Sequence, residues 1–458
     1  MPSLLAPSAL LPSGWAEDVR IDIAPDGTIA QVRADAVEGA GWDVERVAGP
    51  VVAGMPNLHS HAFQRAMAGL AERRRDPSDS FWTWRETMYR AAHRVGPEDL
   101  AAIAAMLFIE MLKAGYTTVG EFHYLHNDTD GALFADPAEM SVRLIQAAAE
   151  TGIGMTLLPV LYMRAGFDGA PLEPAQRRFA MDEDRMMRLL GSLRRHARGM
   201  GGLRIGLAPH SLRAVPVEVV RAMTAALPDE TPIHIHVAEQ LREVEDCLAK
   251  TGARPVELLM VEAPVGPSWC LIHATHVEQS EIEDIAASGA VVGLCPITEA
   301  NLGDGLFPLG PFLAAEGRFG IGSDSNIALN PWEELRLLEY GQRLSQRRRG
   351  VGLPPRASGS VGAGLYHAAV AGGAAALGQP VGALAPGCRA DLLVLDRSRL
   401  TQPEAEGDNL LDCAVFGGSG LPVRDVMVAG LWRVREGRHP AEEGVRPRFL
   451  QALRHVNR

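Results

Sequence analysis

The chain has 458 residues, of which 47% are hydrophobic and 22% charged, a composition typical of a soluble enzyme. This length suits one large domain of about 250–350 residues and a smaller one. With 44 Lys and Arg against 56 Asp and Glu, the net charge is −12, which argues against nucleic acid or an anionic membrane as a partner.

The cysteines and the apolar segments indicate the compartment. Five widely spaced cysteines without a CxxC pair predict free thiols in a reducing environment. No segment approaches the ~20 apolar residues of a membrane-spanning helix, and no basic residue precedes Arg20, as a secretory leader would require. We therefore expect a cytoplasmic protein.

The N-terminal segment predicts a β-hairpin. Apolar residues alternate on both sides of an Asp26-Gly27 turn within 19–32. Residues 1–52 are expected to supply the first half of a small β-sandwich.

From residue 51 to about 326, apolar strands alternate with helical segments. The predicted strands are 51–56, 117–122, 154–163, 203–209, 232–238, 269–274, 290–296 and 319–323. The predicted helices include 97–115, 182–198, 216–226, 241–250 and 279–288. Eight such strands favour a parallel (β/α)8 TIM barrel over residues 53–377. An open doubly wound sheet would also alternate, but it would not bring so many strand ends to one point.

The remaining elements complete the predicted fold. Residues 361–378 are rich in Ala and Gly and predict a closely packed helix without a chemical role. Strand-like sequences follow at 390–396 and 423–434. Residues 378–458 are therefore expected to form the second half of the β-sandwich and the C-terminal tail.

Candidate metal ligands lie at the ends of three predicted barrel strands. His59 and His61 are two residues apart, so on an extended strand both imidazoles point to the same face. His236 and Asp324 lie at the ends of the fifth and eighth strands. Imidazole and carboxylate ligands suit Zn²⁺, Fe(II) and Mn²⁺, and we expect one divalent metal ion, Zn²⁺ by preference. Barrel active sites lie at this end of the strands.

Two neighbouring residues have the chemistry of proton transfer. Glu239 is three residues after His236, a spacing that suits a general acid or base beside the metal, and His273 follows the sixth strand. His234 forms its own HxH pair with His236. Of the two histidines, it is His236 that has Glu239 three residues after it. We therefore predict that His236 is the ligand and that His234 is structural or supports the ligands.

The sequence favours a site for one metal ion. A second ion usually needs a bridging ligand, typically a carbamylated lysine on the fourth strand. The only lysines, Lys113 and Lys250, are both far from that strand. Glu121, after the second strand, is the one carboxylate that would change this prediction.

Together these residues resemble the amidohydrolase superfamily. The matching features are HSH at 59–61, His236-x-x-Glu239, His273, Gly322-Ser323-Asp324-Ser325 and Gly387-x-x-Ala390-Asp391-Leu392. The resemblance covers nearly the whole chain. It implies the branch of mononuclear deaminases and chlorohydrolases, whose members are often dimers, so we expect a homodimer.

Within that branch, four segments are similar to the formimidoylglutamate deiminases of histidine degradation. They are His61-Ala62-Phe63-Gln64-Arg65, Phe81-Trp82-Thr83-Trp84-Arg85, Glu121-Phe122-His123-Tyr124 and Pro209-His210-Ser211-Leu212-Arg213. The resemblance implies that the substrate is the small anion N-formimino-L-glutamate. It also implies the residues that face the substrate, which are Gln64, Arg85, Tyr124, His210 and Arg213.

The residue chemistry agrees with such a substrate. Its two carboxylates suit Arg85 and Arg213, because a guanidinium binds a carboxylate through two parallel hydrogen bonds. In the expected reaction, Asp324 binds the metal and takes a proton from water, and His273 supports the attacking oxygen. Glu239 passes a proton to the imino nitrogen, which leaves as ammonia.

Three other interpretations stay open. A deaminase of a cyclic amine (guanine, adenosine-type or S-adenosylhomocysteine) or a chlorotriazine hydrolase would need a flat aromatic slot in place of the arginines. In a metal-free scaffold protein, we would expect at least one of the metal ligands, or Glu239 or His273, to have been lost. A purely structural zinc site would not be expected at a barrel mouth beside acid and base groups.

Overall fold

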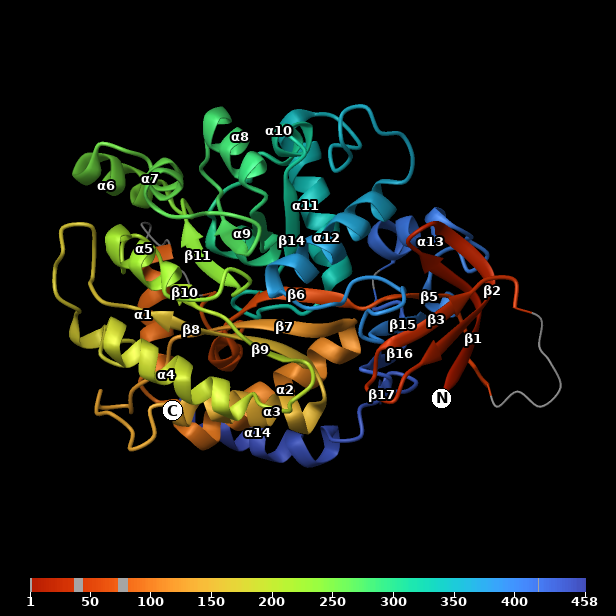
Figure 1. The fold of residues 1–458 in the computed structure, drawn as a ribbon, viewed down its shortest axis with the longest axis horizontal. Helices are drawn as coiled ribbons and strands as arrows, with labels where there is room; N and C mark the ends of the chain where they lie inside the picture. Colours follow the sequence, from red (N-terminus) through yellow and green to blue (C-terminus); the bar gives the residue numbers. More distant parts are fainter. Residues whose placement is uncertain (1, 37–43, 73–80, 419) are drawn as a thin grey trace.

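The computed structural model describes residues 2–36, 44–72, 81–418 and 420–458, with only the backbone at 81 and 82. Figure 1 shows a barrel surrounded by helices and, beside it, a smaller β domain that contains strands from both chain ends. Of the described helices, none is long and apolar enough to cross a membrane. The domain boundaries 1–52, 53–377 and 378–458 stay a prediction.

The barrel consists of parallel strands in sequence order. They are β6 (Met55–Ser60), β7 (Tyr116–His123), β8 (Gly154–Leu161), β9 (Leu203–Ile205) with β10 (Ala208–Pro209), β11 (Ile233–Val237), β12 (Trp269–His273), β13 (Val291–Leu294) and β14 (Arg318–Ile321). Isolated bridges close the circle between Leu207 and Ile233 and between Ser60 and Asp324. The predicted (β/α)8 barrel is therefore confirmed.

The predicted first strand, 51–56, was wrong in its limits. It contains the whole of β5 (Val51–Ala53), which pairs in the small domain, and the start of β6. Gly54 separates them, and its backbone N–H donates to the Asp391 carbonyl. A Cβ at Gly54 would lie 2.3 Å from the Thr117 side chain, so only glycine fits where the chain enters the barrel. His59 consequently lies within β6 rather than after it.

The fourth predicted strand, 203–209, is divided into β9 and β10 at Gly206. A Cβ at Gly206 would lie 2.5 Å from the Pro232 carbonyl oxygen. Glycine thus permits the close backbone approach through which β10 meets β11.

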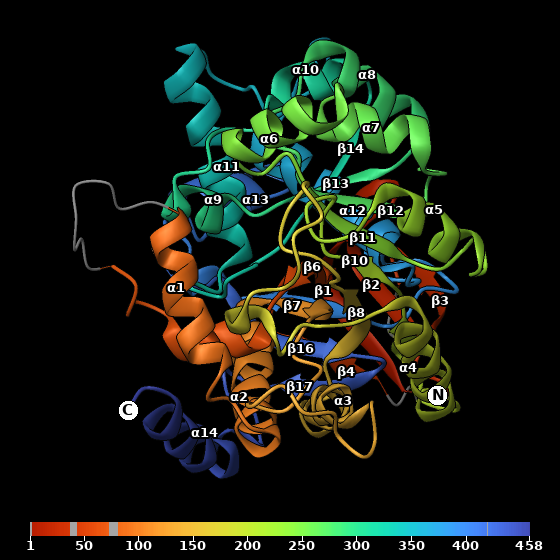
Figure 2. The ribbon, with the colours of Figure 1, turned by 90° about the vertical axis from the view of Figure 1, so that its left-hand side faces the viewer.

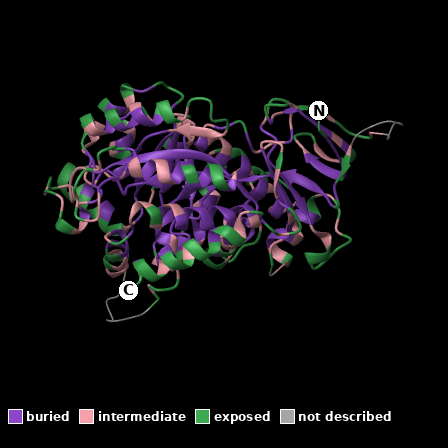
Figure 3. Ribbon diagram, turned by 90° about the horizontal axis from the view of Figure 1, so that it is seen from below, coloured by how far each residue is buried: buried purple, intermediate pink, exposed green. Residues whose placement is uncertain are grey.

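Helices cover the barrel and leave its strands buried (Figure 3). In chain order they include α1 (Phe81–Ala92), α2 (Pro97–Ala114), α3 (Glu139–Thr151), α4 (Glu183–His196), α5 (Val217–Ala225), α6 (Leu241–Thr251), α7 (Pro255–Glu262), α8 (Gln279–Ser288), α9 (Pro296–Leu302), α10 (Leu309–Ala314), α11 (Pro331–Gln346), α12 (Val361–Leu377) and α13 (Asp408–Asp412). A C-terminal helix, α14 (Glu442–Val456), lies beside α2 (Figure 2). Lys113 on α2 pairs with Glu442 at 2.8 Å.

The Ala/Gly-rich helix α12 packs closely against the barrel, as predicted. A Cβ at Gly372 would lie 1.8 Å from the Phe319 carbonyl oxygen of β14. Leu377 and Ala376 join a buried cluster with Leu58 and Ile272 inside the barrel. Small residues therefore bring this helix against strands at the end of the barrel away from the predicted site.

The small domain joins both chain ends in one hydrogen-bonded sheet. Its strands are β1 (Ser3–Leu11), β2 (Gly14–Ile23), β3 (Ile29–Arg33), β4 (Glu45–Arg46), β5, β15 (Leu392–Leu395), β16 (Val423–Val428) and β17 (Leu431–Val434). The predicted hairpin is β2–β3, and β15 pairs with β5. The prediction that the two ends associate is confirmed.

A buried ion pair connects this domain to the barrel. Arg389 Nη2 lies 2.6 Å from Asp391 Oδ2, and Arg389 Nη1 donates to Gln379 Oε1 at 2.7 Å. Thr118 of β7 contacts both charged residues. The pattern Gly387-x-x-Ala390-Asp391-Leu392 thus includes a structural contact at Asp391.

Replacement of Arg389 by methionine should lower the free energy of unfolding by about 3–5 kcal/mol, because Asp391 would stay buried without its partner. Urea denaturation followed by circular dichroism measures the change. Arg448→Met is the control, since Arg448 and Glu150 are both exposed and such pairs contribute about 0–1 kcal/mol. Equal losses in the two variants would contradict this explanation.

Candidate active site

Four predicted metal ligands meet at one end of the barrel. The Nε2 atoms of His59 and His236 are 3.1 Å apart. Asp324 Oδ1 lies 3.2 Å from His61 Nε2 and 3.5 Å from His59 Nε2. Ligand atoms of the three histidines all lie within 4.8 Å of one another, and all four side chains are buried. Strands β6, β11 and β14 thus bring their ends to one point.

The tautomers of two histidines fit a cation. His61 Nδ1 lies 2.9 Å from the Phe122 carbonyl oxygen, and His236 Nδ1 lies 3.0 Å from the His210 carbonyl oxygen. A carbonyl only accepts, so each Nδ1 carries a proton, which leaves the Nε2 of a neutral ring with a lone pair. Both lone pairs are directed at the cluster. A divalent metal ion would give them, and the Asp324 carboxylate, a common partner.

Charge states in the cluster agree with this donor set. Burial lowers the pKa of His59 to about 3 and holds the pKa of His236 well below its usual value. Burial alone would raise the pKa of Asp324, but the adjacent His59 and His61 rings hold it well below its usual value. His59 and His236 are therefore neutral imidazoles beside one carboxylate.

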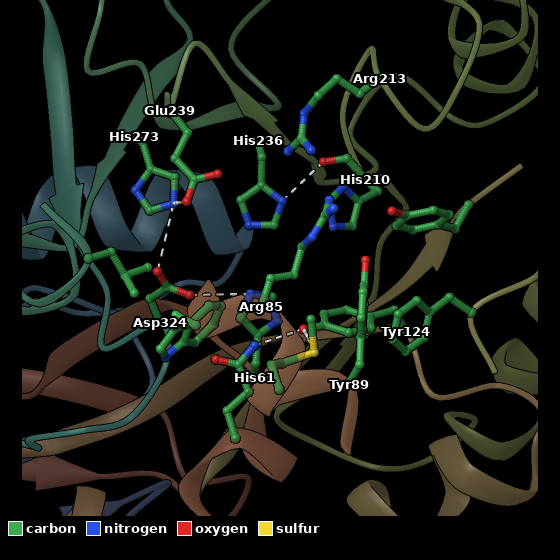
Figure 4. Close-up of a pocket in the computed structure, with 16 residues that line it drawn as sticks. His61, Arg85, Tyr89, Tyr124, His210, Arg213, His236, Glu239, His273 and Asp324 are labelled. Atoms are coloured by element: carbon green, nitrogen blue, oxygen red, sulfur yellow. Dashed lines mark hydrogen bonds and ion pairs between the residues drawn. The ribbon is translucent and has the colours of Figure 1, made fainter. Parts of the chain in front are cut away.

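The predicted proton-transfer residues lie beside the ligands (Figure 4). His273 Nε2 is 3.7 Å from Asp324 Oδ2 and 3.9 Å from Glu239 Oε1. Burial raises the pKa of Glu239, against the opposing charges of His273 and Arg213. Burial would lower the pKa of His273, but a hydrogen bond with Glu299 and nearby carboxylates raise it to about 10. A carboxyl and an imidazolium thus face the space next to Asp324.

Two residues with open roles have clear structural positions. His234 Nε2 is 2.9 Å from the Ala376 carbonyl oxygen of α12, away from the cluster. Glu121 Oε1 accepts a hydrogen bond from the Ala62 backbone N–H at 2.7 Å, so it fixes the chain after His61. These contacts agree with the structural prediction for His234 and assign Glu121 a backbone contact.

All five predicted substrate-facing residues line one cavity with the cluster. These are Gln64, Arg85, Tyr124, His210 and Arg213. Gln64 Nε2 donates to the Tyr124 hydroxyl at 2.7 Å. His210 is neutral because burial holds its pKa well below the usual value. The side chain of Trp82 lies outside the described residues, whereas Trp84 lines the cavity.

A buried carboxylate holds Arg213 in place. Glu243 of α6 has Oε2 4.0 Å from Arg213 Nε, and the same oxygen accepts from the Glu239 backbone N–H at 3.2 Å. Burial would lower the pKa of Arg213, but Glu243 raises it above its usual value. Glu243 therefore contacts both Arg213, which is predicted to bind a substrate carboxylate, and Glu239, which is predicted to transfer a proton.

Several residues of the site were absent from the sequence predictions. Glu299 on α9 accepts from His273 Nδ1 at 3.2 Å and from the Cys295 backbone N–H at 2.8 Å. Asp304 accepts a hydrogen bond from Gln240, and burial raises its pKa to about 9. The cavity lining also includes Met88, Tyr89, Tyr162, Phe179 and Leu302. Glu243, in the first turn of α6 and four residues after Glu239 in the chain, is the one that closeness in sequence could have identified.

A family model described as the amidohydrolase family matches residues 51–433. The chain belongs to the amidohydrolase family. A second model, described as the N-terminal domain of formimidoylglutamate deiminase HutF, matches residues 1–44. The resemblance seen in the sequence is therefore confirmed over both the barrel and the N-terminal strands.

Individual relatives cover the full length of this amidohydrolase. A formimidoylglutamate deiminase of Pseudomonas aeruginosa is 54% identical over 454 residues, 99% of each chain. The crystal structure of an amidohydrolase from Brucella melitensis is 48% identical, covers 100% of each chain and has a TM-score of 0.95. An adenosine deaminase from Xanthomonas campestris, solved with bound zinc, has a TM-score of 0.82 at 22% identity, covering 99% of this chain and 98% of that one. This last likeness concerns the fold alone.

Proposed function

We propose that this amidohydrolase hydrolyses N-formimino-L-glutamate to N-formyl-L-glutamate and ammonia, a step of histidine degradation. The observation that carries the proposal is the presence of Arg85 and Arg213 in the same cavity as the histidine cluster and Glu239. Two cations suit the two carboxylates of this substrate. The likeness to a formimidoylglutamate deiminase over 99% of both chains adds support.

One divalent metal ion, zinc in our proposal, would be held by His59, His61, His236 and Asp324. When bound, it supplies the Lewis acidity that makes water a nucleophile at neutral pH. The facing Nε2 lone pairs and the nearby carboxylate support this assignment. Glu121 is occupied by a backbone contact, which supports a site for a single ion.

The protein's own groups would move the protons. Asp324 has a carboxylate oxygen, Oδ2, toward His273, so it is placed to accept a proton from the attacking water while His273 holds the oxygen that results. Glu239, whose pKa burial raises, then protonates the imino nitrogen. Asp324 then returns its proton to the same nitrogen, which leaves as ammonia when the C–N bond breaks. The hydroxyl proton passes to Glu239, and the carbon retains the water oxygen as the formyl carbonyl.

The cavity wall would orient the substrate. We assign the carboxylates to Arg85 and Arg213, with Gln64, Tyr124 and His210 as further polar contacts. Buried polar groups of this kind reject a substrate that leaves them unpaired.

Ammonia release by the zinc-loaded protein tests the function. The protein is offered N-formimino-L-glutamate, N-formimino-L-aspartate, guanine and adenosine in separate assays. We expect turnover of the glutamate compound and little or none of the two nucleobase compounds. Turnover of a cyclic amine alone would replace this proposal with a purine deaminase that has the same fold and metal site.

Replacement of Arg213 by alanine should raise KM for N-formimino-L-glutamate by about 100-fold and change kcat less. The variant loses charge-assisted hydrogen bonds of about 1.5–3 kcal/mol to a carboxylate and leaves Glu243 unpaired. Steady-state ammonia release measures both constants. Arg221→Ala is the control, because Arg221 is half-exposed on α5 and pairs with Glu262. An unchanged KM in Arg213→Ala would show that Arg213 does not bind a substrate carboxylate.

We also propose that the protein acts in the cytoplasm as a homodimer. Free cysteines, three of them buried, agree with a reducing compartment. The net charge of −12 agrees with the absence of nucleic-acid and membrane partners. Sedimentation of the purified protein measures the oligomeric state directly, against a chain mass of 49.1 kDa.

A further inference from the structure

A buried glutamine lies behind the cavity wall and has one possible orientation. Gln176, at the end of the short helix η2 (Pro174–Gln176), is 1% exposed. Its Oε1 accepts from the Glu173 backbone N–H at 2.9 Å, and only the amide oxygen can accept. The amide nitrogen therefore faces the other way, where it donates to the Tyr162 hydroxyl at 3.0 Å and to the Tyr89 hydroxyl at 3.4 Å.

The two tyrosine hydroxyls are consequently fixed as donors. Each already accepts a hydrogen bond from Gln176, so its own proton needs a different acceptor. Among the described residues, the hydrogen bond accepted from Gln176 is the only one that either hydroxyl makes. Tyr89 is 8% exposed and Tyr162 is 6% exposed, so both side chains are largely buried where they line the cavity. A buried donor without an acceptor costs free energy, which a ligand with an acceptor would recover.

The surroundings of the hydroxyls favour an anionic acceptor. Both tyrosines line the cavity together with Arg85 and Arg213. The Arg85 guanidinium lies 5.5 Å from the centre of the Tyr89 ring. In Figure 4 the hydroxyl of Tyr89 points toward the part of the cavity bordered by Arg85 and His210. Burial raises the pKa of Tyr162 above its usual value, so its proton stays available for donation.

We propose that Tyr89 and Tyr162 donate hydrogen bonds to one carboxylate of the substrate, and that Gln176 is a positioning residue that holds both hydroxyls as donors. This inference rests on the proposed function and extends it. Recognition of that carboxylate would combine guanidinium charge with two oriented neutral donors. A substrate with an uncharged group at this position would then bind less well.

Removal of each hydroxyl tests the donors. Tyr89→Phe and Tyr162→Phe should each raise KM for N-formimino-L-glutamate by about 10-fold or more, with kcat within about threefold, because a hydrogen bond to a charged group is lost. Tyr340→Phe is the control, since Tyr340 is 38% exposed on α11. Wild-type KM values in both cavity variants would overturn the proposal.

Reversal of the glutamine tests the positioning role. In Gln176→Glu, the carboxylate can still accept from the Glu173 N–H, but its second oxygen accepts from the tyrosines where the amide donated. Both hydroxyl protons then turn away from the substrate. KM should rise at least as much as in the Tyr89→Phe/Tyr162→Phe double variant, while the thermal unfolding midpoint stays near that of Gln176→Leu. A wild-type KM in Gln176→Glu would overturn this role.

Binding of glutarate separates this inference from the proposed function. Isothermal titration calorimetry of the zinc-loaded protein should show glutarate binding that weakens about 10-fold in Tyr162→Phe. If this result comes with no ammonia release from N-formimino-L-glutamate, the reaction is wrong but the carboxylate site stands. If ammonia is released normally and the Tyr162→Phe variant binds glutarate as tightly as wild type, the reaction stands and the site is wrong.

Discussion

Glu239→Gln should lower kcat for N-formimino-L-glutamate by about 10³-fold. General acid–base catalysis contributes roughly 10²–10⁴-fold to enzymatic rates, and a glutamine of the same shape cannot carry the proton to the imino nitrogen. KM should change little, because Glu239 faces His273 and Arg213 and is not one of the residues assigned to bind the substrate carboxylates. Steady-state ammonia release gives both constants.

Two controls make this result specific. Glu245→Gln, on the exposed side of α6, should have wild-type kinetics. The zinc content of Glu239→Gln should equal that of the wild type, which separates a lost proton transfer from a lost metal. A kcat within tenfold of wild type would show that a group other than Glu239 protonates the leaving nitrogen.

His236→Ala should remove the metal ion and lower kcat/KM by about 10³-fold or more, since a Lewis acid supplies several kcal/mol of transition-state stabilisation. The zinc content, measured by mass spectrometry of the dialysed protein, should fall from about one ion per chain to less than a tenth. The wild-type value also tests the single-ion proposal.

The other half of the HxH pair provides the matched control. His234→Gln keeps a donor toward the Ala376 carbonyl, 2.9 Å from His234 Nε2, and should keep its zinc and most of its activity. Loss of zinc in His234→Gln but not in His236→Ala would exchange the assignments of the two histidines. Two ions per wild-type chain would contradict the reasoning from Glu121 and the lysines.

The site was predictable where its chemistry follows strand ends. His59, His61, His236, His273 and Asp324 lie at or beside the carboxyl ends of parallel strands, and a barrel brings all such ends to one rim. Short-range sequence was sufficient for these residues because strand position alone decides where they point. The same reasoning placed Glu239, which is close in sequence to His236.

Long-range partners were not predictable from local patterns. Glu299 and Gln176 act through contacts with His273 and with Tyr89, the latter 87 residues away in the chain. Nothing in their immediate sequence distinguishes them from ordinary helix residues. The strand limits at Gly54 and Gly206 were missed for a similar reason, because tertiary contacts with Thr117 and Pro232 decide them.

Barrel closure between Ser60 and Asp324 also has a consequence for synthesis of the protein. The carbonyl of His59 accepts hydrogen bonds from the backbone N–H groups of Ser323 and Asp324, so the first and last barrel strands join at the ligand cluster itself. Contacts of such long sequence separation form late, because a large loop must close first. A nascent chain would therefore acquire its complete ligand set only after residue 324 has left the ribosome, and an early metal ion would meet only histidines.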